Sequence, residues 1–247
     1  MIIDMHCHAH EYDEKTIIKF ISNKILIVSV ADDPSTSIKN IEIGEKFKGK
    51  IIPCVGIHPW ETTKYNINDV YKLVDLAIEN NIKCIGEIGL DRLFVSKTIS
   101  KQIEIFKAFL EASRSYDFIY NLHTPKTWRE VFELLVKYDV KRAYFHWYTG
   151  PTDLLKDIES MDYFIGINPA ALIQEKHKRI IEKAPLKIMI TESDGPYKYK
   201  SLQLNPFLIE KTIELISYIK GVEREYVVRM IEFNVNKILN IMSQINR

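Results

Sequence analysis

Short apolar runs alternate with longer amphipathic stretches along the whole chain. The short runs are rich in β-branched and aromatic residues and are apolar on both faces, which is the pattern of strands buried in a parallel sheet. We expect such strands at Ile2–Cys7, Ile25–Val30, Ile51–Ile57, Lys83–Ile88, Phe118–Leu122, Arg142–Phe145, Tyr163–Ile167 and Ile188–Thr191.

Helical periodicity fills the segments between these strands. We expect helices at 98–116, Asn68–Asn80 and Lys126–Tyr138, and two helices broken near Gly221 between Pro206 and Asn246. About eight strand–helix repeats with short connections favour a single (β/α)8 TIM barrel over an open doubly wound sheet. No glycine-rich phosphate loop follows the first strand, which argues against a dinucleotide-binding fold. We therefore predict one α/β barrel domain, residues 1–247, with an extra C-terminal helix.

The composition narrows the class of protein. The chain has 247 residues and a formal net charge of +1, so it lacks the basic field of a protein that coats nucleic acid non-specifically. No apolar run reaches the ~18 residues of a membrane span and no signal-peptide pattern begins the chain, so we expect a cytoplasmic protein without membrane contact. Cys7, Cys54 and Cys84 lie in or beside apolar runs, and we expect them to be buried thiols rather than a disulfide framework.

The candidate chemistry lies where the predicted strands end. His6 and His8 end the first strand, and residues two apart on a strand point to the same side, so both imidazoles can bind one ion. Taken alone, such a pair is more often two ordinary polar residues. Other strands, however, end in His58, Glu87, Asp91, His123, His146, Glu192 and Asp194. In a barrel these ends form one ring that holds the active site, and so much buried polarity indicates a ligand.

Mixed imidazole and carboxylate ligands suit Zn, Mn, Fe or Co better than Mg or Ca. Two ions about 3.5–4 Å apart can clamp the attacking and leaving oxygens of a displacement, and a carboxylate between them can bridge. Glu87 is the candidate bridge. The sequence therefore predicts a hydrolase with two divalent ions, for which Zn, Mn, Mg and Co are the candidates.

The ordered motifs resemble those of the TatD family of metal-dependent deoxyribonucleases, which are amidohydrolase-like barrels. The resemblance extends roughly from position 2 to 240. It rests on Asp4-x-His6-Cys7-His8, Gly56-x-His58-Pro59, Gly86-Glu87-Ile88-Gly89-Leu90-Asp91, His146 with Tyr148-Thr149-Gly150, and Glu192-Ser193-Asp194-Gly195-Pro196. The two short histidine motifs are weak signals alone, but the ordered set is specific.

The resemblance implies a role for each of these residues. One ion would be held by His6, His8, Glu87 and Asp194, and the second by Glu87, His123 and His146. Asp194 would also orient a bridging hydroxide and take up the proton of its parent water, and His58 would contact the substrate near the scissile group. The implied activity is a DNA phosphodiesterase of the 3′–5′ exonuclease type acting on ends or single strands.

The chain departs from the family pattern at two places. The family often has a basic residue two positions after the fifth-strand histidine, but here the run is His123-Thr124-Pro125 and the nearest cation is Lys126. Arg92 follows the Gly-Leu-Asp run, where the family commonly has an aromatic residue. Arg92 and Lys126 are therefore the candidate phosphate contacts, and DNA is a weaker expectation than metal-dependent hydrolysis.

Several other residues have ordinary interpretations. We expect His10 to have no role and His177, within the charged run 175–179, to be solvated. Asp4 is expected to accept a hydrogen bond from a metal-binding histidine, and Asp91 to do the same or to cap the next helix. The aromatic residues that follow strand ends either stack on bases or pack against each other; they are Trp60, Trp147, Tyr148, Tyr197 and Tyr199.

Two other functions remain open. An amidohydrolase-type enzyme would cleave a C–N or ester bond of a small molecule with the same ions, and the fold alone does not exclude it. Several enzymes of that superfamily bridge their metals with a carboxylated lysine at the fourth strand, where this chain has Glu87, which favours the nuclease-like branch. A catalytically silent binding scaffold is disfavoured because every expected ligand is present.

Overall fold

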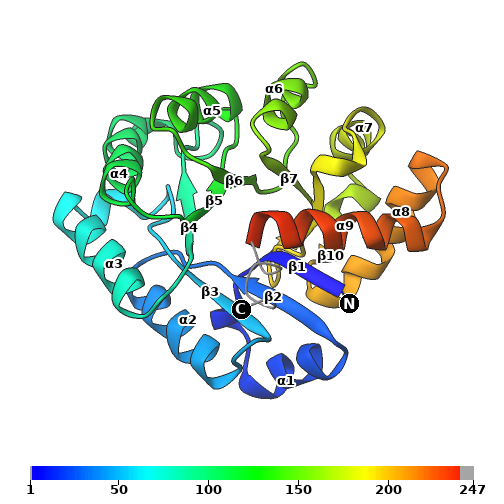
Figure 1. Ribbon diagram of the computed structural model, residues 1–247, viewed down its shortest axis with the longest axis horizontal. Coiled ribbons are helices and arrows are strands. Elements are labelled where there is room, and N and C mark those ends of the chain that lie inside the picture. The colour runs from blue at the N-terminus through cyan, green and yellow to red at the C-terminus, as the bar shows by residue number, and fades with distance from the viewer. Residues whose placement is uncertain (1, 240–247) are drawn as a thin grey trace.

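Eight parallel strands form one sheet in the order β1 to β8, surrounded by helices (Figure 1). The computed structural model describes residues 2–239. The predicted barrel is confirmed, and every predicted strand is present with its ends within two residues of the expected ones. The strands are β1 Ile2–Cys7, β2 Ile25–Ser29, β3 Ile51–Val55, β4 Cys84–Gly89, β5 Ile119–His123, β6 Arg142–Phe145, β7 Phe164–Ile167 and β8 Met189–Thr191.

The helices are α1 Glu14–Ser22, α2 Pro34–Lys46, α3 Ile67–Glu79, α4 Ile99–Ala112, α5 Trp128–Lys137, α6 Leu154–Ser160, α7 Glu175–Lys183, α8 Ile209–Lys220 and α9 Arg224–Leu239. The predicted break between the last two is confirmed at Gly221, whose φ of 63° is a left-handed conformation that glycine adopts without strain. The part of the predicted last helix beyond Leu239 lies outside the described residues. A short hairpin, β9 Lys198–Tyr199 and β10 Leu202–Gln203, was not predicted.

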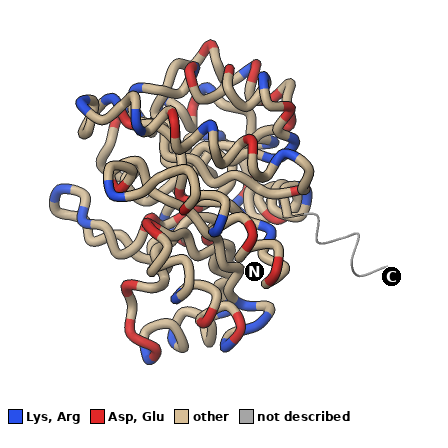
Figure 2. Tube along the Cα trace, turned by 90° about the vertical axis from the view of Figure 1, so that its left-hand side faces the viewer, with Lys and Arg blue, Asp and Glu red and all other residues tan. Residues whose placement is uncertain are grey.

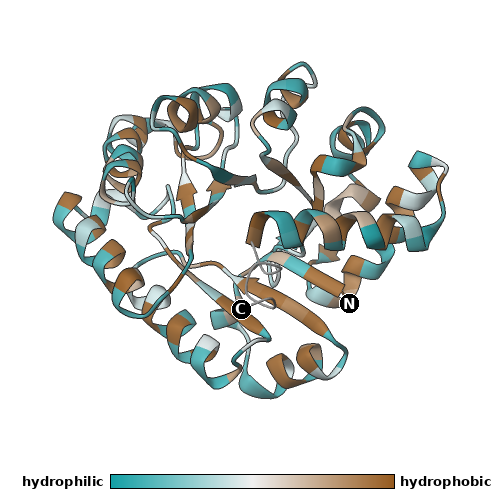
Figure 3. Ribbon diagram, viewed as in Figure 1, coloured by the Kyte–Doolittle hydropathy of each residue, from teal (hydrophilic) through white to brown (hydrophobic). Residues whose placement is uncertain are grey.

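Apolar strands and the inward faces of the helices make the core. The strands are mostly brown in Figure 3, whereas the helices alternate brown and teal along their length. In α4, for example, Ile105, Phe106 and Phe109 are buried while Lys101 and Glu104 pair at the surface. Lys, Arg, Asp and Glu are interspersed around the outside (Figure 2), in keeping with the small net charge. None of the described helices is long and apolar enough to cross a membrane.

The two ends of the barrel are unlike. The extra helix α9 packs at the amino end of the strands, where the Asn234 amide donates to the carbonyl oxygens of Leu186 and Met189, each at 2.8 Å. At the other end, β8 and the loop after it are joined to β1, because the Asp194 N–H donates to the His6 carbonyl and the His8 N–H to that of Gly195, both at 2.8 Å. This junction brings Asp194 beside the two histidines of β1.

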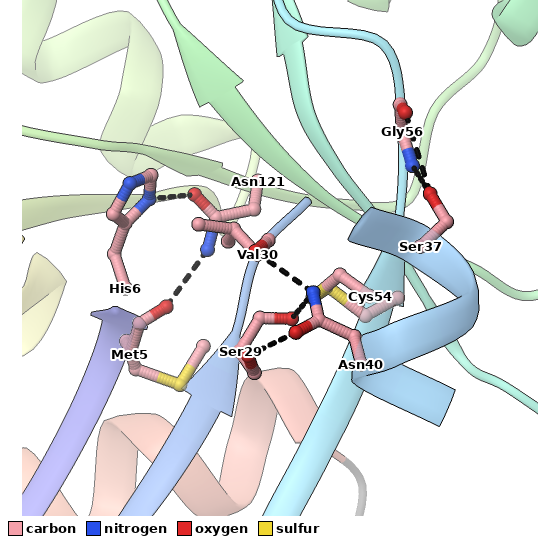
Figure 4. The surroundings of a disulfide bond; sticks show 10 residues. Met5, His6, Ser29, Val30, Ser37, Asn40, Cys54, Gly56 and Asn121 are labelled. Carbon is pink, nitrogen blue, oxygen red and sulfur yellow. Dashed lines mark hydrogen bonds between the residues drawn. A yellow bond between two sulfur atoms is a disulfide. The ribbon is translucent and has the colours of Figure 1, made fainter. Parts of the chain in front are cut away.

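Two cysteines are joined, contrary to the prediction of three free thiols. Cys54 on β3 and Cys84 on β4 form a disulfide (Figure 4), while Cys7 is a free, buried thiol. The two residues are paired across neighbouring strands with their Cα atoms 4.5 Å apart, within the range that a disulfide spans. Their positions in the sequence do not reveal this register, which is why the prediction was wrong.

His177 is fully buried, so the prediction that it is solvated was wrong. Its charged neighbours occupy the outer face of α7, whereas the imidazole points inward and its Nε2 lies 3.2 Å from the Gly166 carbonyl oxygen. Burial lowers the pKa of His177 to about 4. The neutral imidazole therefore donates to this carbonyl at neutral pH.

This burial predicts a pH-dependent loss of stability. His177 protonates near pH 6.5 in the unfolded chain but only near pH 4 in the folded one, so its contribution is complete above pH 6.5 and is lost as the pH falls. By pH 4 the loss reaches roughly 3 kcal/mol. Urea unfolding between pH 7 and 4.5 should show a shallower pH dependence for His177→Gln than for the wild type. Equal slopes would show that this imidazole does not govern acid stability.

Candidate active site

A cavity of about 1060 Å³ opens at the carboxyl ends of the strands. Its lining includes His8, His58, Glu87, His123, His146 and Asp194. His6 is fully buried and contacts Glu87 and Asp194 through its ring. All six metal ligands expected from the sequence therefore lie at this end of the barrel, as does His58.

The first cluster contains His6, His8, Glu87 and Asp194. Glu87 Oε2 lies 3.2 Å from His6 Nε2 and 3.5 Å from His8 Nε2. Asp194 Oδ1 lies 3.6 Å from each of these two nitrogens. Ligand atoms about 2.0–2.2 Å from a tetrahedral zinc ion are about 3.4 Å apart. The atoms of His6, His8 and Glu87 lie close enough together for one ion, and Asp194 lies beside the two histidines.

The orientation of the His6 ring supports this fit. Its Nδ1 lies 2.8 Å from Asn121 Oδ1, and the Asn121 amide nitrogen donates to the Met5 carbonyl at 2.7 Å (Figure 4). Asn121 therefore accepts from Nδ1 and leaves Nε2 for a cation, as an outer hydrogen-bond partner does in metal sites. His6 Nε2 is buried without a hydrogen-bond partner. Burial opposes charge on this ring, but Glu87 outweighs it and raises the pKa of His6 to about 9.

Asn121 has the role that the sequence analysis assigned to Asp4. Asp4 Oδ1 instead accepts from the backbone N–H groups of Ser193, at 2.8 Å, and His6, at 3.3 Å. It therefore holds the loop after β8 against β1 and contacts neither ring nitrogen of His6. The expectation for Asp4 was wrong because its carboxylate is taken up by the backbone N–H of Ser193, in the loop after β8.

The second cluster contains Glu87, His123 and His58. Glu87 Oε1 lies 2.6 Å from His123 Nδ1 and 3.5 Å from His58 Nε2, and these two nitrogens are 3.2 Å apart. Glu87 thus directs one carboxylate oxygen to each cluster. Burial would raise the pKa of Glu87, but the surrounding imidazoles of His6, His58 and His123 hold it well below its usual value. A bridging carboxylate needs this arrangement.

Asp91 has the first of the two roles considered for it, contact with a histidine, but it does not cap the next helix, α4, which begins at Ile99. Its Oδ2 accepts from His123 Nε2 at 2.9 Å, which directs Nδ1 of that ring toward Glu87. Its Oδ1 accepts from the backbone N–H groups of Leu93 and Phe94, which start the following loop.

His146 lies apart from the second cluster. Its ring stacks on His6 with the centroids 3.6 Å apart, and its Nδ1 lies 3.1 Å from Glu192 Oε1. The expected set Glu87, His123 and His146 is therefore not brought together, and His58 lies beside Glu87 and His123 instead. Trp147, with φ of 42°, turns the chain directly after His146 and donates its N–H to Glu192, so His146 faces β8.

Glu192, for which no role was predicted, is fully buried and forms a third group with His6 and His146. Burial would raise the pKa of Glu192, but the neighbouring His146 keeps it below its usual value. The signal in the sequence was an acidic residue at a strand end, two positions before Asp194.

Asp32, just after β2, was also missed. Its two oxygens lie 3.3 Å from His8 Nδ1 and 3.0 Å from His10 Nε2. Asp32 therefore contacts Nδ1 of the His8 ring, on the side away from Glu87. His10, for which no role was expected, pairs with the same carboxylate. Burial would raise the pKa of Asp32, but the hydrogen bond from His10 and the nearby His8 ring hold it well below its usual value.

The two expected phosphate contacts are placed differently. Arg92 is tied to Glu130 by two hydrogen bonds of 3.0 Å and does not line the cavity. Lys126 lines the cavity and has no ion-pair partner among residues 2–239. Two other cations that line it, Lys176 and Arg179 of α7, were not anticipated.

The family model that matches this chain is "TatD related DNase", and it covers residues 3–240. The chain belongs to this family. Membership confirms the resemblance found in the motifs and the coarser functional expectation, a hydrolase of the TatD type.

Individual relatives agree with this. The chain is 32% identical to a TATDN1 homolog of Vairimorpha ceranae, over 90% of this chain and 88% of that protein. It is 28% identical to a protein of Methanocaldococcus jannaschii named as an uncharacterized metal-dependent hydrolase, over 95% of both. Among solved structures, the TatD homolog YJJV of Escherichia coli superposes with a TM-score of 0.84 at 17% identity, over 97% of this chain and 98% of that one. This last likeness concerns the fold alone.

Proposed function

We propose that this chain is a metal-dependent phosphodiesterase that cleaves DNA at ends or in single strands, of the 3′–5′ exonuclease type. The observation that carries the proposal is the Glu87 carboxylate, which directs one oxygen to each of two histidine clusters. Relatives named as deoxyribonucleases, among them human "Deoxyribonuclease TATDN3" at 22% identity, support DNA as the substrate.

The residues fit two divalent ions. His6, His8, Glu87 and Asp194 would hold one, and Glu87 and His123 would hold the other, with His146 as the third ligand after a turn of its ring or with His58 in that place. Bound ions would polarise the phosphoryl group and lower the pKa of water. Asp194 is the proton acceptor for the attacking water. Burial keeps the pKa of His58 below its usual value in spite of Glu87, so a neutral His58 is available to donate to a substrate oxygen.

The test is an assay of purified protein with Mn, Mg, Zn or Co on oligonucleotides labelled at either end, together with elemental analysis. We expect up to two ions per chain and release of nucleotides from the 3′ end. Failure to bind any transition metal after reconstitution would refute the proposal that the protein is a metal-dependent hydrolase of DNA. The same analysis of His146→Ala and His58→Ala identifies the third ligand of the second ion, because only loss of that ligand lowers the metal content.

Replacement of Lys126 should weaken hydrolysis of DNA more than replacement of Arg92. A cation beside the reacting phosphate stabilises the charge that grows on its oxygens, and Lys126 lines the cavity whereas Arg92 is paired with Glu130. For Lys126→Ala we expect kcat/KM on oligonucleotides to fall by an amount that corresponds to about 1–3 kcal/mol of lost transition-state stabilisation, the range of a charge-assisted hydrogen bond. Arg92→Ala is the matched control. A larger loss for Arg92→Ala would assign the phosphate contact to that residue.

The same assay tests the amidohydrolase alternative. A neutral amide or ester develops a single oxyanion, which needs no further cation beside the ions. If the wild type leaves oligonucleotides intact with every metal but hydrolyses amides or lactones, the nuclease proposal fails and the alternative replaces it.

A further inference from the structure

Three aromatic side chains form a wall on the β6–β8 side of the cavity. We call Trp147, Tyr197 and Tyr199 the aromatic wall; all three line the cavity. The Trp147 ring lies edge-to-face with Tyr197 and Tyr199, at centroid distances of 6.0 and 5.2 Å. Because edge-to-face packing does not cover both ring faces, the wall keeps surface free for stacking, and Tyr197 is 46% exposed.

Hydrogen bonds hold this wall in place. Trp147 Nε1 donates to Gln174 Oε1 at 2.9 Å, and Gln174 Nε2 donates to the Tyr199 hydroxyl at 3.0 Å. The Trp147 backbone is held in its left-handed conformation by the bond from its N–H to Glu192, at 2.8 Å. The polar edges of Trp147 and Tyr199 thus have partners within the protein, so a ligand that stacks on these two rings breaks no hydrogen bond and meets rings that are already ordered.

Unpaired cations lie next to the wall. Lys176 and Arg179 are three residues apart on α7, so they share one helix face, and both line the cavity. Both are exposed, and no ion pair is found for either within the described part of the chain. The charged residues that line the cavity after β1, β2 and β3 are acidic: Glu11, Asp32, Asp33 and Glu61. Asp153, the acidic lining residue after β6, is paired with Arg129. A polyanion is therefore favoured over α7 and repelled from the β1–β3 part of the rim.

We propose that the aromatic wall, together with Lys176 and Arg179, is a binding subsite for an unpaired nucleotide that flanks the scissile phosphate. The base stacks on the wall and the neighbouring phosphates contact the two cations. This inference rests on the proposed function, and it names the substrate as single-stranded or frayed DNA. A base within a duplex is stacked on its neighbours and does not present its face to the wall, whereas every unpaired base has a π-face for such a platform.

The test compares variants of the subsite with matched controls. The variants are Trp147→Ala, Trp147→Phe and the double variant Lys176→Ala/Arg179→Ala. The control is Lys178→Ala on the same helix, which removes a charge that is paired with Glu175 at 2.7 Å and does not line the cavity. One readout is kcat/KM for hexathymidylate divided by kcat/KM for bis(4-nitrophenyl) phosphate, a diester without a flanking nucleotide. The other is the Kd of fluorescent hexathymidylate, from anisotropy, with each variant combined with Asp194→Asn to slow turnover.

We expect Trp147→Ala to lower the kcat/KM ratio and to raise the Kd by about tenfold, and Trp147→Phe to restore most of both. The double variant should reduce the slope of log K against log salt by about 1.4, because each phosphate contact on a single strand contributes about 0.7. Lys178→Ala should match the wild type.

The outcomes separate this inference from the proposed function. If the protein cleaves DNA but neither Trp147→Ala nor the double variant changes the kcat/KM ratio or the Kd, the subsite is overturned and the proposed function is not. Binding that weakens as expected, in a protein that cleaves no DNA, would overturn the phosphodiesterase and leave the subsite standing. Equal losses on both substrates, without a change in Kd, would assign a structural role to the wall and overturn the subsite.

Discussion

Asp194→Asn is expected to leave the barrel folded and at least one ion bound, and to lower kcat by about 10²–10⁴-fold. Asp194 Oδ1 faces the Nε2 atoms of His6 and His8, each at 3.6 Å, at the bottom of the cavity. Its backbone has φ of 53°, a left-handed conformation that asparagine also tolerates, and its N–H donates to the His6 carbonyl. The amide therefore preserves the local structure but does not accept the proton of the attacking water.

Circular dichroism reports on the fold, elemental analysis measures the bound ions, and steady-state kinetics with the most active metal measures kcat. Asp75→Asn, an exposed residue of α3, is the matched control and should behave as the wild type. Near-normal turnover of Asp194→Asn would assign the base elsewhere, and His58 is the next candidate.

Glu87→Gln is expected to lower the metal content and to reduce kcat/KM by on the order of 10³-fold or more, because several kcal/mol of transition-state stabilisation depend on the ions. Glu87 contacts both clusters, through Oε2 to His6 at 3.2 Å and Oε1 to His123 at 2.6 Å. A neutral amide has the same shape, but it offers one oxygen in place of two and no charge. The loss should therefore affect both ions.

Elemental analysis after reconstitution and dialysis measures this loss, and unfolding in urea reports on the fold. Glu111→Gln, at an exposed position of α4, is the control for removal of a carboxylate. Two retained ions with normal activity would show that Glu87 does not bridge, and would remove the main support of the proposed function.

Local patterns in the sequence determined most of the barrel and the residues at its catalytic end. A buried parallel strand needs a short run of apolar residues, so the eight strands could be located from the positions of such runs along the chain. The alternation of side chains along β1 placed His6 and His8 on one side, and the strand-end positions of Glu87, His123 and Asp194 placed them at the same mouth. These features depend on the side-chain period of about two residues in a strand and about 3.6 residues in a helix, and both periods can be recognised in the sequence.

Only the tertiary structure decided which side chains meet across strands. The contacts of Asn121 with His6, of Asp32 with His8 and of Glu192 with His146 depend on the register between strands, which the chain does not display. The same holds for the disulfide between Cys54 and Cys84. Likewise, the charged run around His177 did not reveal which face of α7 is buried, because that depends on how the helix is rotated against the barrel. A helix or strand is encoded by its near neighbours, but a site is assembled by packing between distant segments, and that packing selected the partners.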